Sequence, residues 1–210
     1  MEKNEFPVQN VQEEKAKLRK KIKNLYKILA RQEIAEKSKK ILNNLKLLEI
    51  WSRASTILAF LPLSDEVDTT FIIEDALMHG KKVAVPRIKN NDMAFLYITS
   101  LAADSLKKHD FGMYEPLPTA EPVNMENKDS ADSRRILILT PGIAFDKQCN
   151  RLGRGKSFYD RFLSKYGKNC IKAGIAFNFQ IAENLPIEEH DVQLDFVITD
   201  ENIFSSGSGA

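Results

Sequence analysis

The stretch Arg134–Phe145, RRILILTPGIAF, is the most apolar segment of the sequence and decides how its fold is read. A short apolar run that ends at a Pro-Gly turn is typical of a strand buried on both faces of a sheet. Similar runs occur on either side of it in the chain, at Ser55–Leu63, Lys81–Ile88, Cys170–Phe177 and Asp195–Asp200. These runs predict the strands of one sheet.

Helical patterns separate or precede these strands. Between Glu13 and Leu48, apolar residues recur at three- and four-residue steps and predict two helices. Phe71–Gly80 predicts a helix that ends at Gly80, and a further helix is expected from about Ser157 to Tyr166, with Gly167 as its stop. Alternating strands and helices favour a single α/β domain of three layers, in which a mostly parallel sheet has helices on both faces.

The limits of this domain follow from composition along the chain. Residues 1–14 form an N-terminal extension that need not be ordered, residues 15–204 form the folded domain, and residues 205–210, rich in Ser and Gly, form a flexible tail. The polar, aperiodic segment Thr119–Asp132 is expected to be a surface excursion.

Composition limits the class of protein. The 210 residues are 43% hydrophobic and 29% charged, which is typical of a soluble globular protein. The net charge of +2 argues against a nucleic-acid or membrane partner, and no window nears the roughly 18 apolar residues of a membrane span. No apolar run follows the N-terminal charges, and Cys149 and Cys170 have neither pairing nor metal spacing. We therefore expect a cytoplasmic protein.

One loop carries a pattern of cations and glycines. In Asn150–Leu163, NRLGRGKSFYDRFL, the Gly-Lys-Ser ending matches a Walker phosphate loop, but Asn150 stands where the first glycine is required. Arg151, Arg154 and Lys156 nevertheless lie between an expected strand and an expected helix, where α/β proteins bind ligands. Backbone N–H groups, glycines and cations together favour a polyphosphate. The spacing alone leaves a solvated turn equally open.

Acidic and histidine side chains give weaker signals. Asp160, just after this loop, could hold a divalent cation that bridges phosphates, or could simply interact with the dipole of the helix that follows. His79, His109 and His190 share no metal-binding spacing.

Five blocks of the sequence resemble one known family. Thr140–Leu163, TPGIAFDKQCNRLGRGKSFYDRFL, is similar to the signature of the 5-formyltetrahydrofolate cyclo-ligase family, in which P-G-x-A-F-D precedes R-L-G-x-G-[KG]-G-[YF]-Y-D. The other four blocks also match that family in order and spacing: Lys15–Arg19 (KAKLR), Phe60–Thr69 (FLPLSDEVDT), Gly80–Ile88 (GKKVAVPRI) and Leu185–Thr199 (LPIEEHDVQLDFVIT). The resemblance extends from about Lys15 to Thr199.

The resemblance implies a fold and an activity. The fold would be similar to sugar-isomerase and CoA-transferase domains, with residues 15–204 as the cyclo-ligase domain. The activity would be the ATP-dependent cyclisation of 5-formyltetrahydrofolate to 5,10-methenyltetrahydrofolate, through phosphorylation of the formyl oxygen and release of ADP and phosphate. Mg²⁺ would be the cofactor, ATP the co-substrate, and the partners small molecules only. A monomer is expected.

The resemblance also implies roles for individual residues. Arg154, Lys156 and Tyr159 would be catalytic, Leu61, Glu66 and Tyr159 would bind the folate, and Asp160 and Asp191 would hold the metal. The ATP contacts would be Lys15, Ala16, Lys17, Leu18, Arg19, Arg151, Leu152, Gly153, Arg154, Gly155, Lys156, Ser157, Phe158 and Tyr159. The chain departs from the family at Ser157, where glycine is usual, and at Phe158, where tyrosine is common.

Two other functions stay open at this point. A non-catalytic folate or nucleotide binder on the same scaffold would bind ligands without releasing ADP, and Ser157 gives that reading slight support. A P-loop NTPase would hydrolyse nucleotide without folate, which Asn150 argues against.

Overall fold

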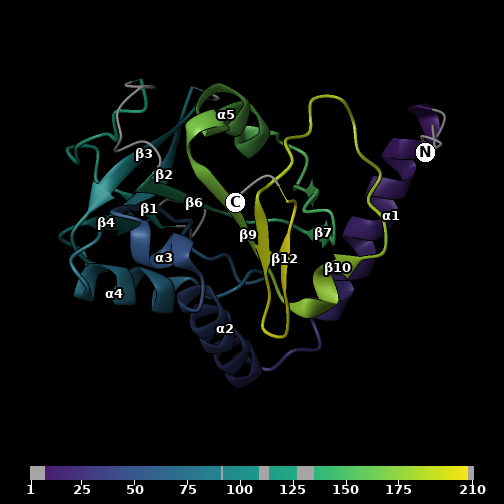
Figure 1. The fold of residues 1–210 in the computed structure, drawn as a ribbon, viewed down its shortest axis with the longest axis horizontal. Coiled ribbons are helices and arrows are strands. Elements are labelled where there is room, and N and C mark those ends of the chain that lie inside the picture. The colour runs from purple at the N-terminus through teal and green to yellow at the C-terminus, as the bar shows by residue number, and fades with distance from the viewer. Residues whose placement is uncertain (1–7, 91, 109–113, 127–134, 208–210) are drawn as a thin grey trace.

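The computed structural model describes residues 8–90, 92–108, 114–126 and 135–207 (Figure 1). Its helices are α1 (Val8–Tyr26), α2 (Arg31–Lys46), α3 (Glu49–Arg53), α4 (Thr70–Met78) and α5 (Phe158–Tyr166), with 3-10 turns at Gly167–Asn169 and Asn178–Gln180. Its strands are β1 (Thr56–Leu58), β2 (Lys82–Lys89), β3 (Asp92–Ile98), β4 (Leu106–Lys108), β5 (Tyr114–Pro116), β6 (Ile136–Thr140), β7 (Ala144–Asp146), β8 (Arg151–Leu152), β9 (Ile171–Ile175), β10 (Ile181–Ala182), β11 (Phe196–Ile198) and β12 (Ile203–Ser205).

A mostly parallel sheet forms the middle layer. Within the described residues it has seven strands in the order β12-β11-β9-β6-β1-β2-β3. The neighbouring pairs from β11 to β2 are parallel, while β12 and β3 pair antiparallel at the two edges. The predicted parallel sheet is therefore confirmed, with antiparallel strands added at its edges.

Both faces of this sheet are covered by helices. Alternate residues of a strand point to opposite faces, so Ile57 of β1 packs in one apolar cluster while Leu58 packs in the other. The Ile57 cluster includes residues of α2, α3 and α4, and the Leu58 cluster includes Phe162 of α5. Figure 1 shows α5 on one side of the sheet and α2 to α4 on the other, which confirms the predicted three layers.

The stretch Arg134–Phe145 forms two strands rather than one. Within its described part, β6 ends at Thr140 and β7 begins at Ala144 in a separate three-stranded sheet with β8 and β10. Pro141 has no N–H to donate, so the chain leaves the large sheet at this residue. At Gly142 a Cβ atom would lie 2.5 Å from Cζ of Phe145, so the turn has no room for a side chain.

Other boundaries also differ from the sequence prediction. The run Ser55–Leu63 contains only the short strand β1, because the chain turns out of the sheet into a loop that carries Pro62. Residues 8–14, which we assigned to the N-terminal extension, form the first turns of α1, while residues 1–7 lie outside the described part. Gly80, at φ +71°, follows α4 as predicted, and Gly167 caps α5.

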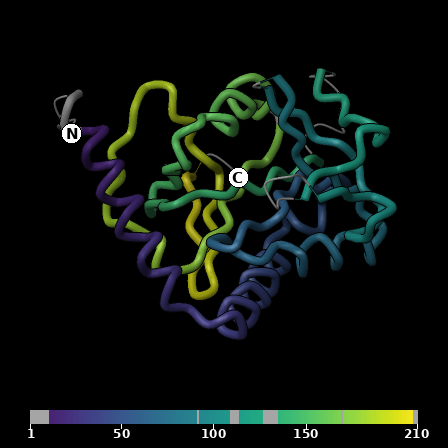
Figure 2. Tube along the Cα trace, turned by 180° about the vertical axis from the view of Figure 1, so that it is seen from behind, coloured from purple at the N-terminus to yellow at the C-terminus, as the bar shows by residue number. Residues whose placement is uncertain are grey.

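Helix α1 lies at one side of the molecule. In Figures 1 and 2 it runs beside the loop that connects β10 to β11, residues 183–195. Its last turn is fixed in the core, because the Tyr26 hydroxyl donates to Oε1 of Gln180 at 2.9 Å and the Tyr26 ring packs edge-on to Phe179. This docking brings the first turns of α1 to residues from the opposite end of the chain.

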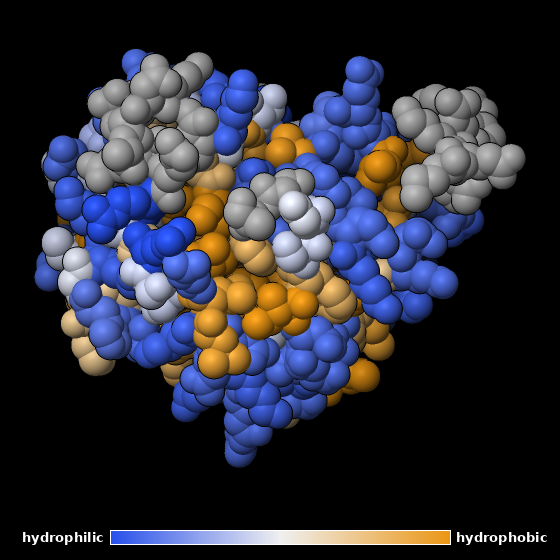
Figure 3. Space-filling view, viewed as in Figure 1, coloured by the Kyte–Doolittle hydropathy of each residue, from blue (hydrophilic) through white to orange (hydrophobic). Residues whose placement is uncertain are grey.

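The surface is mixed in character. Figure 3 shows hydrophobic residues in a band through the middle of the viewed face, with hydrophilic residues over most of the remainder. Among the described helices, none combines the length and apolarity required to cross a bilayer.

Candidate active site

Two loops that come after the parallel strands β1 and β6 in the chain meet at one edge of the large sheet. The acidic loop, residues 61–68, follows β1, and the glycine loop, residues 150–157, begins with β8 of the small sheet, which the chain enters after β6. The carboxyl ends of parallel strands share an edge, which is where open α/β sheets bind ligands. Arg154 joins the loops, and its Nη2 lies 2.6 Å from Oδ1 of Asp65. The structure thus brings together the loops that we predicted to bind folate and ATP.

Arg154 is bound by two carboxylates. Its Nη1 donates to Oδ2 of Asp65 at 3.1 Å, and its Nε donates to Oε1 of Glu66 at 3.0 Å. The other oxygen of Glu66 accepts the Leu63 N–H at 3.0 Å. Burial raises the pKa of Glu66 even though Arg154 favours its ionised form, whereas at Asp65 the contacts to Arg154 outweigh burial and lower the pKa.

Arg151 and Asp160 form an ion pair behind the glycine loop. Nη2 of Arg151 lies 2.6 Å from Oδ1 of Asp160, and Nη1 donates to the carbonyl of Pro141 at 3.2 Å. A Cβ atom at Gly153 would lie 2.9 Å from Nη1 of Arg151, so glycine at that position gives the guanidinium its room. Arg151 therefore supports the loop from inside.

Tyr159 presents a buried hydroxyl to this region. Within the described residues, neither this hydroxyl nor Nε of Arg151 has a hydrogen-bond partner. The Tyr159 ring packs edge-on to Phe95, with centroids 6.4 Å apart, and its centroid lies 5.7 Å from Cζ of Arg151. Burial, and to a lesser degree the charge of Glu66, raises the pKa of Tyr159 and keeps the phenol protonated. Unpaired buried polar atoms are rare in proteins and require an explanation, such as a ligand that supplies the partner.

Helix α1 contributes two cations from one face. Nε of Arg19 donates to the Gly153 carbonyl at 2.9 Å, so α1 touches the glycine loop directly. Lys15, one turn earlier and buried, lies 2.7 Å from Glu188 and 2.8 Å from Asp191 on the β10–β11 loop. Burial lowers the pKa of Arg19, and the hydrogen bond from Lys15 lowers that of Glu188.

The remaining predicted ATP contacts do not share one surface. Lys17 is exposed and pairs with Glu14 at 3.1 Å, Ala16 is exposed, and Leu18 packs against the core. In the glycine loop, Leu152 is buried in β8. Lys156 is exposed, and within the described residues it has no ion-pair partner.

The departures from the family pattern fall at the start of α5. Ser157 adopts φ +50° and ψ +23°, the left-handed region that favours glycine, and its side chain makes no capping hydrogen bond. Gly155 also has positive φ, at +97°. Phe158 contacts the Arg161 guanidinium, 5.1 Å from the ring centroid. The backbone at position 157 therefore keeps the geometry of a glycine although the residue is serine.

A cavity of about 800 Å³ opens beside the acidic loop. Its lining contains two of the three residues that we predicted to bind the substrate, Leu61 and Glu66, but not Tyr159. It also contains residues of α2 and of the β4–β5 hairpin: Arg31, Ile34, Leu106 and Tyr114.

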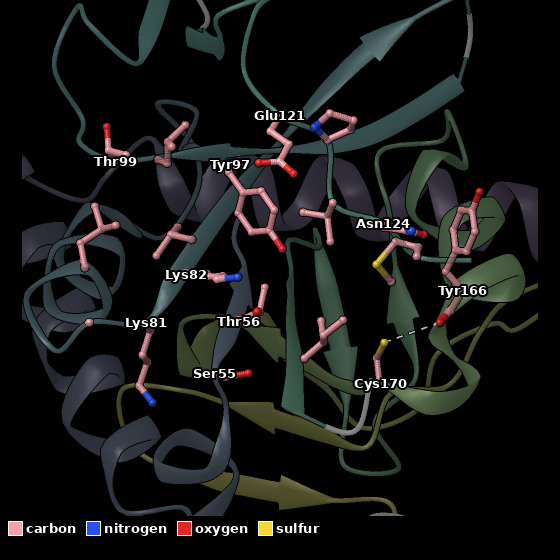
Figure 4. A pocket seen from close by; sticks show the side chains of 18 of the residues that line it. Ser55, Thr56, Lys81, Lys82, Tyr97, Thr99, Glu121, Asn124, Tyr166 and Cys170 are labelled. Carbon is pink, nitrogen blue, oxygen red and sulfur yellow. Dashed lines mark hydrogen bonds between the residues drawn. The ribbon is translucent and has the colours of Figure 1, made fainter. Parts of the chain in front are cut away.

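A larger cavity, of about 1020 Å³, lies at the other end of the strands. Figure 4 shows Tyr97 and Lys82 projecting into it, with Lys82 Nζ 5.9 Å from the Tyr97 ring centroid. None of the predicted site residues lines this cavity. We therefore place the candidate site beside the smaller cavity, which Leu61 and Glu66 line and where Arg154 contacts Glu66.

The two carboxylates predicted to hold a metal are each engaged by a cation. Asp160 is paired with Arg151, and Asp191 is paired with Lys15 and also accepts the Glu188 N–H at 2.9 Å. Among the described residues, no group of three acidic, histidine or cysteine side chains could hold a metal ion. In this arrangement the two carboxylates do not fit a shared magnesium site.

Some residues at the site were not predicted from the sequence. Asp65 and Glu188 both lie in blocks that resemble the family, but only the structure shows that they contact Arg154 and Lys15. The histidines contribute little, since His190 Nε2 lies 3.8 Å from Asp191 and His79 lies beside Asp75 on α4. His109 lies outside the described residues.

Comparisons with known proteins agree with this picture. The family described as the 5-formyltetrahydrofolate cyclo-ligase family matches residues 11–200. A 5-formyltetrahydrofolate cyclo-ligase from Mus musculus is 31% identical over 163 residues, which is 72% of this chain and 76% of that protein. One from Haemophilus influenzae is 34% identical over 144 residues, covering 68% and 74%. The solved structure of Aquifex aeolicus 5,10-methenyltetrahydrofolate synthetase has a TM-score of 0.77 and 32% identity, and the match covers 93% of this chain and 94% of that one.

Proposed function

Because this chain belongs to the 5-formyltetrahydrofolate cyclo-ligase family, we propose that it cyclises 5-formyltetrahydrofolate to 5,10-methenyltetrahydrofolate, with ATP as co-substrate and with release of ADP and phosphate. One observation carries the location of the reaction. The unpaired hydroxyl of Tyr159 and Nε of Arg151 are buried beside the junction of the acidic and glycine loops. That junction is where the two substrates would meet.

The reaction needs an activated formyl group. A formyl carbon bonded to nitrogen is a poor electrophile, and its oxygen is a poor leaving group. Transfer of the terminal phosphoryl group of ATP to the formyl oxygen breaks the bond between the β-γ bridging oxygen and phosphorus and releases ADP. The nitrogen at position 10 then attacks the formyl carbon and loses its proton, and the C–O bond breaks as phosphate departs. Positioning and charge neutralisation catalyse phosphoryl transfer.

The folate side of the site is assigned to the 800 Å³ cavity. Glu66 would accept hydrogen bonds from the donors of the pterin ring, and Leu61 would contact the ring system. Tyr159 would contact both substrates through its hydroxyl, which remains a donor because burial raises its pKa.

The nucleotide side is assigned to α1 and the glycine loop. Lys15 and Arg19 lie on one face of α1, and Arg19 already contacts the loop at Gly153. Arg154 and Lys156 would stabilise the transferring phosphoryl group. Magnesium at Asp160 and Asp191 remains a prediction from the resemblance, and it enters none of these steps because each carboxylate is paired with a cation.

Three further parts of the proposal are coarser. We propose a monomer that acts on small molecules; the near-neutral net charge argues against a nucleic-acid partner. A cytoplasmic location and a relationship to sugar-isomerase and CoA-transferase folds remain proposals from the sequence. Size-exclusion chromatography with light scattering would measure the oligomeric state.

The test is the absorbance of the methenyl product, whose conjugated system absorbs where the substrate does not. We expect a signal that requires both ATP and 5-formyltetrahydrofolate. Lys156→Ala should reduce kcat about 10²- to 10³-fold, the range for loss of one preorganised charge contact. Lys168 is also exposed and lies at the larger cavity, so Lys168→Ala is the matched control and should retain the parent rate.

Two outcomes would contradict the proposal. Unchanged turnover in folded Lys156→Ala would remove that residue from the mechanism. A folded parent protein that binds both ligands but gives no ATP-dependent product would instead be the non-catalytic binder, and Ser157→Gly would be the next variant to assay.

A further inference from the structure

Most of the hydrogen-bond donors on the guanidinium of Arg154 are already bonded to the acidic loop. Arginine has five N–H groups in a planar fork. Asp65 accepts from both Nη atoms, at 3.1 Å and 2.6 Å, and its main-chain carbonyl accepts from Nη2 at 3.4 Å. Glu66 accepts from Nε at 3.0 Å. A phosphate that approaches from the glycine loop therefore finds few free donors on Arg154.

Charge leads to the same conclusion. One guanidinium faces two carboxylates, so the cluster of Asp65, Glu66 and Arg154 carries a net negative charge. An anionic phosphate is repelled by this cluster as long as both carboxylates remain on Arg154. Arg154 can act in phosphoryl transfer only after part of this contact is exchanged.

The two carboxylates differ in exposure. The Glu66 side chain is 9% exposed, whereas the side chains of Asp65 and Arg154 are 32% and 33% exposed. A partly exposed ion pair contributes only modestly to stability. The Asp65–Arg154 contact is thus the part of the cluster that can open without disturbing the core.

We propose that Asp65 is a positioning residue that holds Arg154 on the folate side of the site until nucleotide phosphates compete for it, which couples the binding of the two substrates. The inference rests on the proposed function. When the pterin ring engages Glu66, one of the two carboxylates is withdrawn from Arg154. The phosphates then compete with Asp65 alone. Folate should therefore tighten ATP binding, and ATP should tighten folate binding by the same factor.

The experiment measures binding without turnover. The dissociation constant of a non-hydrolysable ATP analogue is measured by calorimetry in the absence and in the presence of saturating 5-formyltetrahydrofolate. In the parent protein, folate should lower the dissociation constant of the analogue at least about 5-fold, which is the lower end of common coupling factors. Asp65→Asn should bind the analogue more tightly than the parent does in the absence of folate, because only Glu66 then competes with the phosphates for Arg154.

A variant of a neighbouring acid, Asp68, tests whether the effect of Asp65 is specific or is general repulsion between negative charges. Asp68 lies on the same loop, but its carboxylate accepts from the N–H and hydroxyl of Thr70, at 3.1 Å and 2.6 Å. Asp68→Asn removes the same charge and should change the analogue affinity less than 2-fold. Asp65→Ser also removes the carboxylate and should act like Asp65→Asn. It takes the place of Asp65→Asn if the asparagine variant does not fold.

The outcomes distinguish this inference from the proposed function. A parent protein that binds neither the analogue nor folate would overturn the proposed function. A parent that binds both, combined with an Asp65→Asn variant whose analogue affinity is unchanged or weaker, would overturn only the role of Asp65. An Asp68→Asn variant that tightened the analogue as much as Asp65→Asn would also overturn it, because the effect would then be long-range repulsion.

Discussion

Asp160 and Arg151 are joined by an ion pair of 2.6 Å, with side chains only 10% and 4% exposed. The pair connects α5 to β8 underneath the glycine loop, and Arg151 continues the contact to the Pro141 carbonyl. Asp160 was one of the two residues predicted to hold magnesium, yet its carboxylate has a contact that is internal to the protein. Its effect on stability can therefore be measured without nucleotide or metal.

Asp160→Ala should destabilise the protein even with EDTA present. Removing one partner of a buried ion pair leaves an uncompensated charge and costs about 3–5 kcal/mol. For a protein of this size that corresponds to a fall in Tm on the order of 10 °C, measurable by calorimetry. Asp191→Ala, on the β10–β11 loop, is a useful comparison because its partner Lys15 would keep Glu188. If Asp160→Ala melted like the parent in EDTA but lost Mg²⁺-dependent activity, a metal role would replace the structural one.

Tyr159→Phe should raise stability while lowering turnover. Its hydroxyl is buried without a partner, so removing it removes a desolvation penalty of about 1–3 kcal/mol. Tm of the ligand-free protein should rise by roughly 2–4 °C or more. Tyr26→Phe is the matched control, because that buried hydroxyl donates to Gln180 at 2.9 Å and its loss should lower Tm. Equal losses of stability in both variants would mean that Tyr159 is satisfied in solution.

Ser157→Gly should stabilise the fold and tighten nucleotide binding. A residue with a side chain pays about 1–2 kcal/mol in the left-handed region, of which glycine's greater freedom in the unfolded chain cancels about half. The remaining gain should raise Tm by on the order of 2 °C. Ser164→Gly makes the same exchange on an exposed position of α5 and should lower Tm, because glycine weakens a helix. A Tm for Ser157→Gly below that of the parent would show that the serine is not strained.

Glu66→Gln should stabilise the protein at neutral pH while weakening folate binding. Burial raises the pKa of Glu66 above its ordinary value of 4.5, so the folded protein holds this proton more tightly than the unfolded chain does. Protonation of Glu66 therefore favours the folded protein. This contribution to the free energy of unfolding is complete below the ordinary pKa of glutamate and is lost as pH rises through the pKa of Glu66 in the folded protein. A neutral glutamine avoids that loss.

The corresponding measurement is the difference in Tm between Glu66→Gln and the parent across pH. The difference should favour the variant at pH 7 and shrink toward zero near pH 4, where the parent glutamate is protonated in both states. Glu49→Gln, an exposed acid on α3, controls for the change in net charge. A stabilisation that increased toward acid would mean that burial does not dominate at Glu66.

Much of the central sheet could be predicted because its strands are buried on both faces. The apolar runs at β1, β2, β6, β9 and β11 stand out in the sequence for that reason. The edge strand β3 was missed although residues 93–98, MAFLYI, form a continuous hydrophobic run. At the other edge, β12 has only three residues and Ile203 remains exposed, so no apolar run marks it in the sequence.

Only the part of the site that is formed by residues close together in sequence could be predicted. The glycine loop and the start of α5 are consecutive in the chain, so they must lie next to each other. The contact of Arg154 with Asp65 joins residues 89 positions apart, and no local pattern encodes it. The positive φ of Ser157 was also hidden, because the torsion is imposed by the turn into α5 rather than by serine itself.

The contacts of α1 have a consequence for the order in which the molecule assembles during synthesis. Lys15 is translated early, but Glu188 and Asp191 follow it by 173 and 176 residues. A nascent chain that lacks the β10–β11 loop has neither Glu188 nor Asp191 to pair with Lys15. Contacts between residues so far apart in sequence form late, because the chain loses the entropy of closing the intervening loop before the contact can stabilise it. Helix α1 thus acquires its complete set of contacts only after the β10–β11 loop has been synthesised. Truncation after β9 should remove its contacts with Gln180, Glu188 and Asp191 and leave it more open to protease.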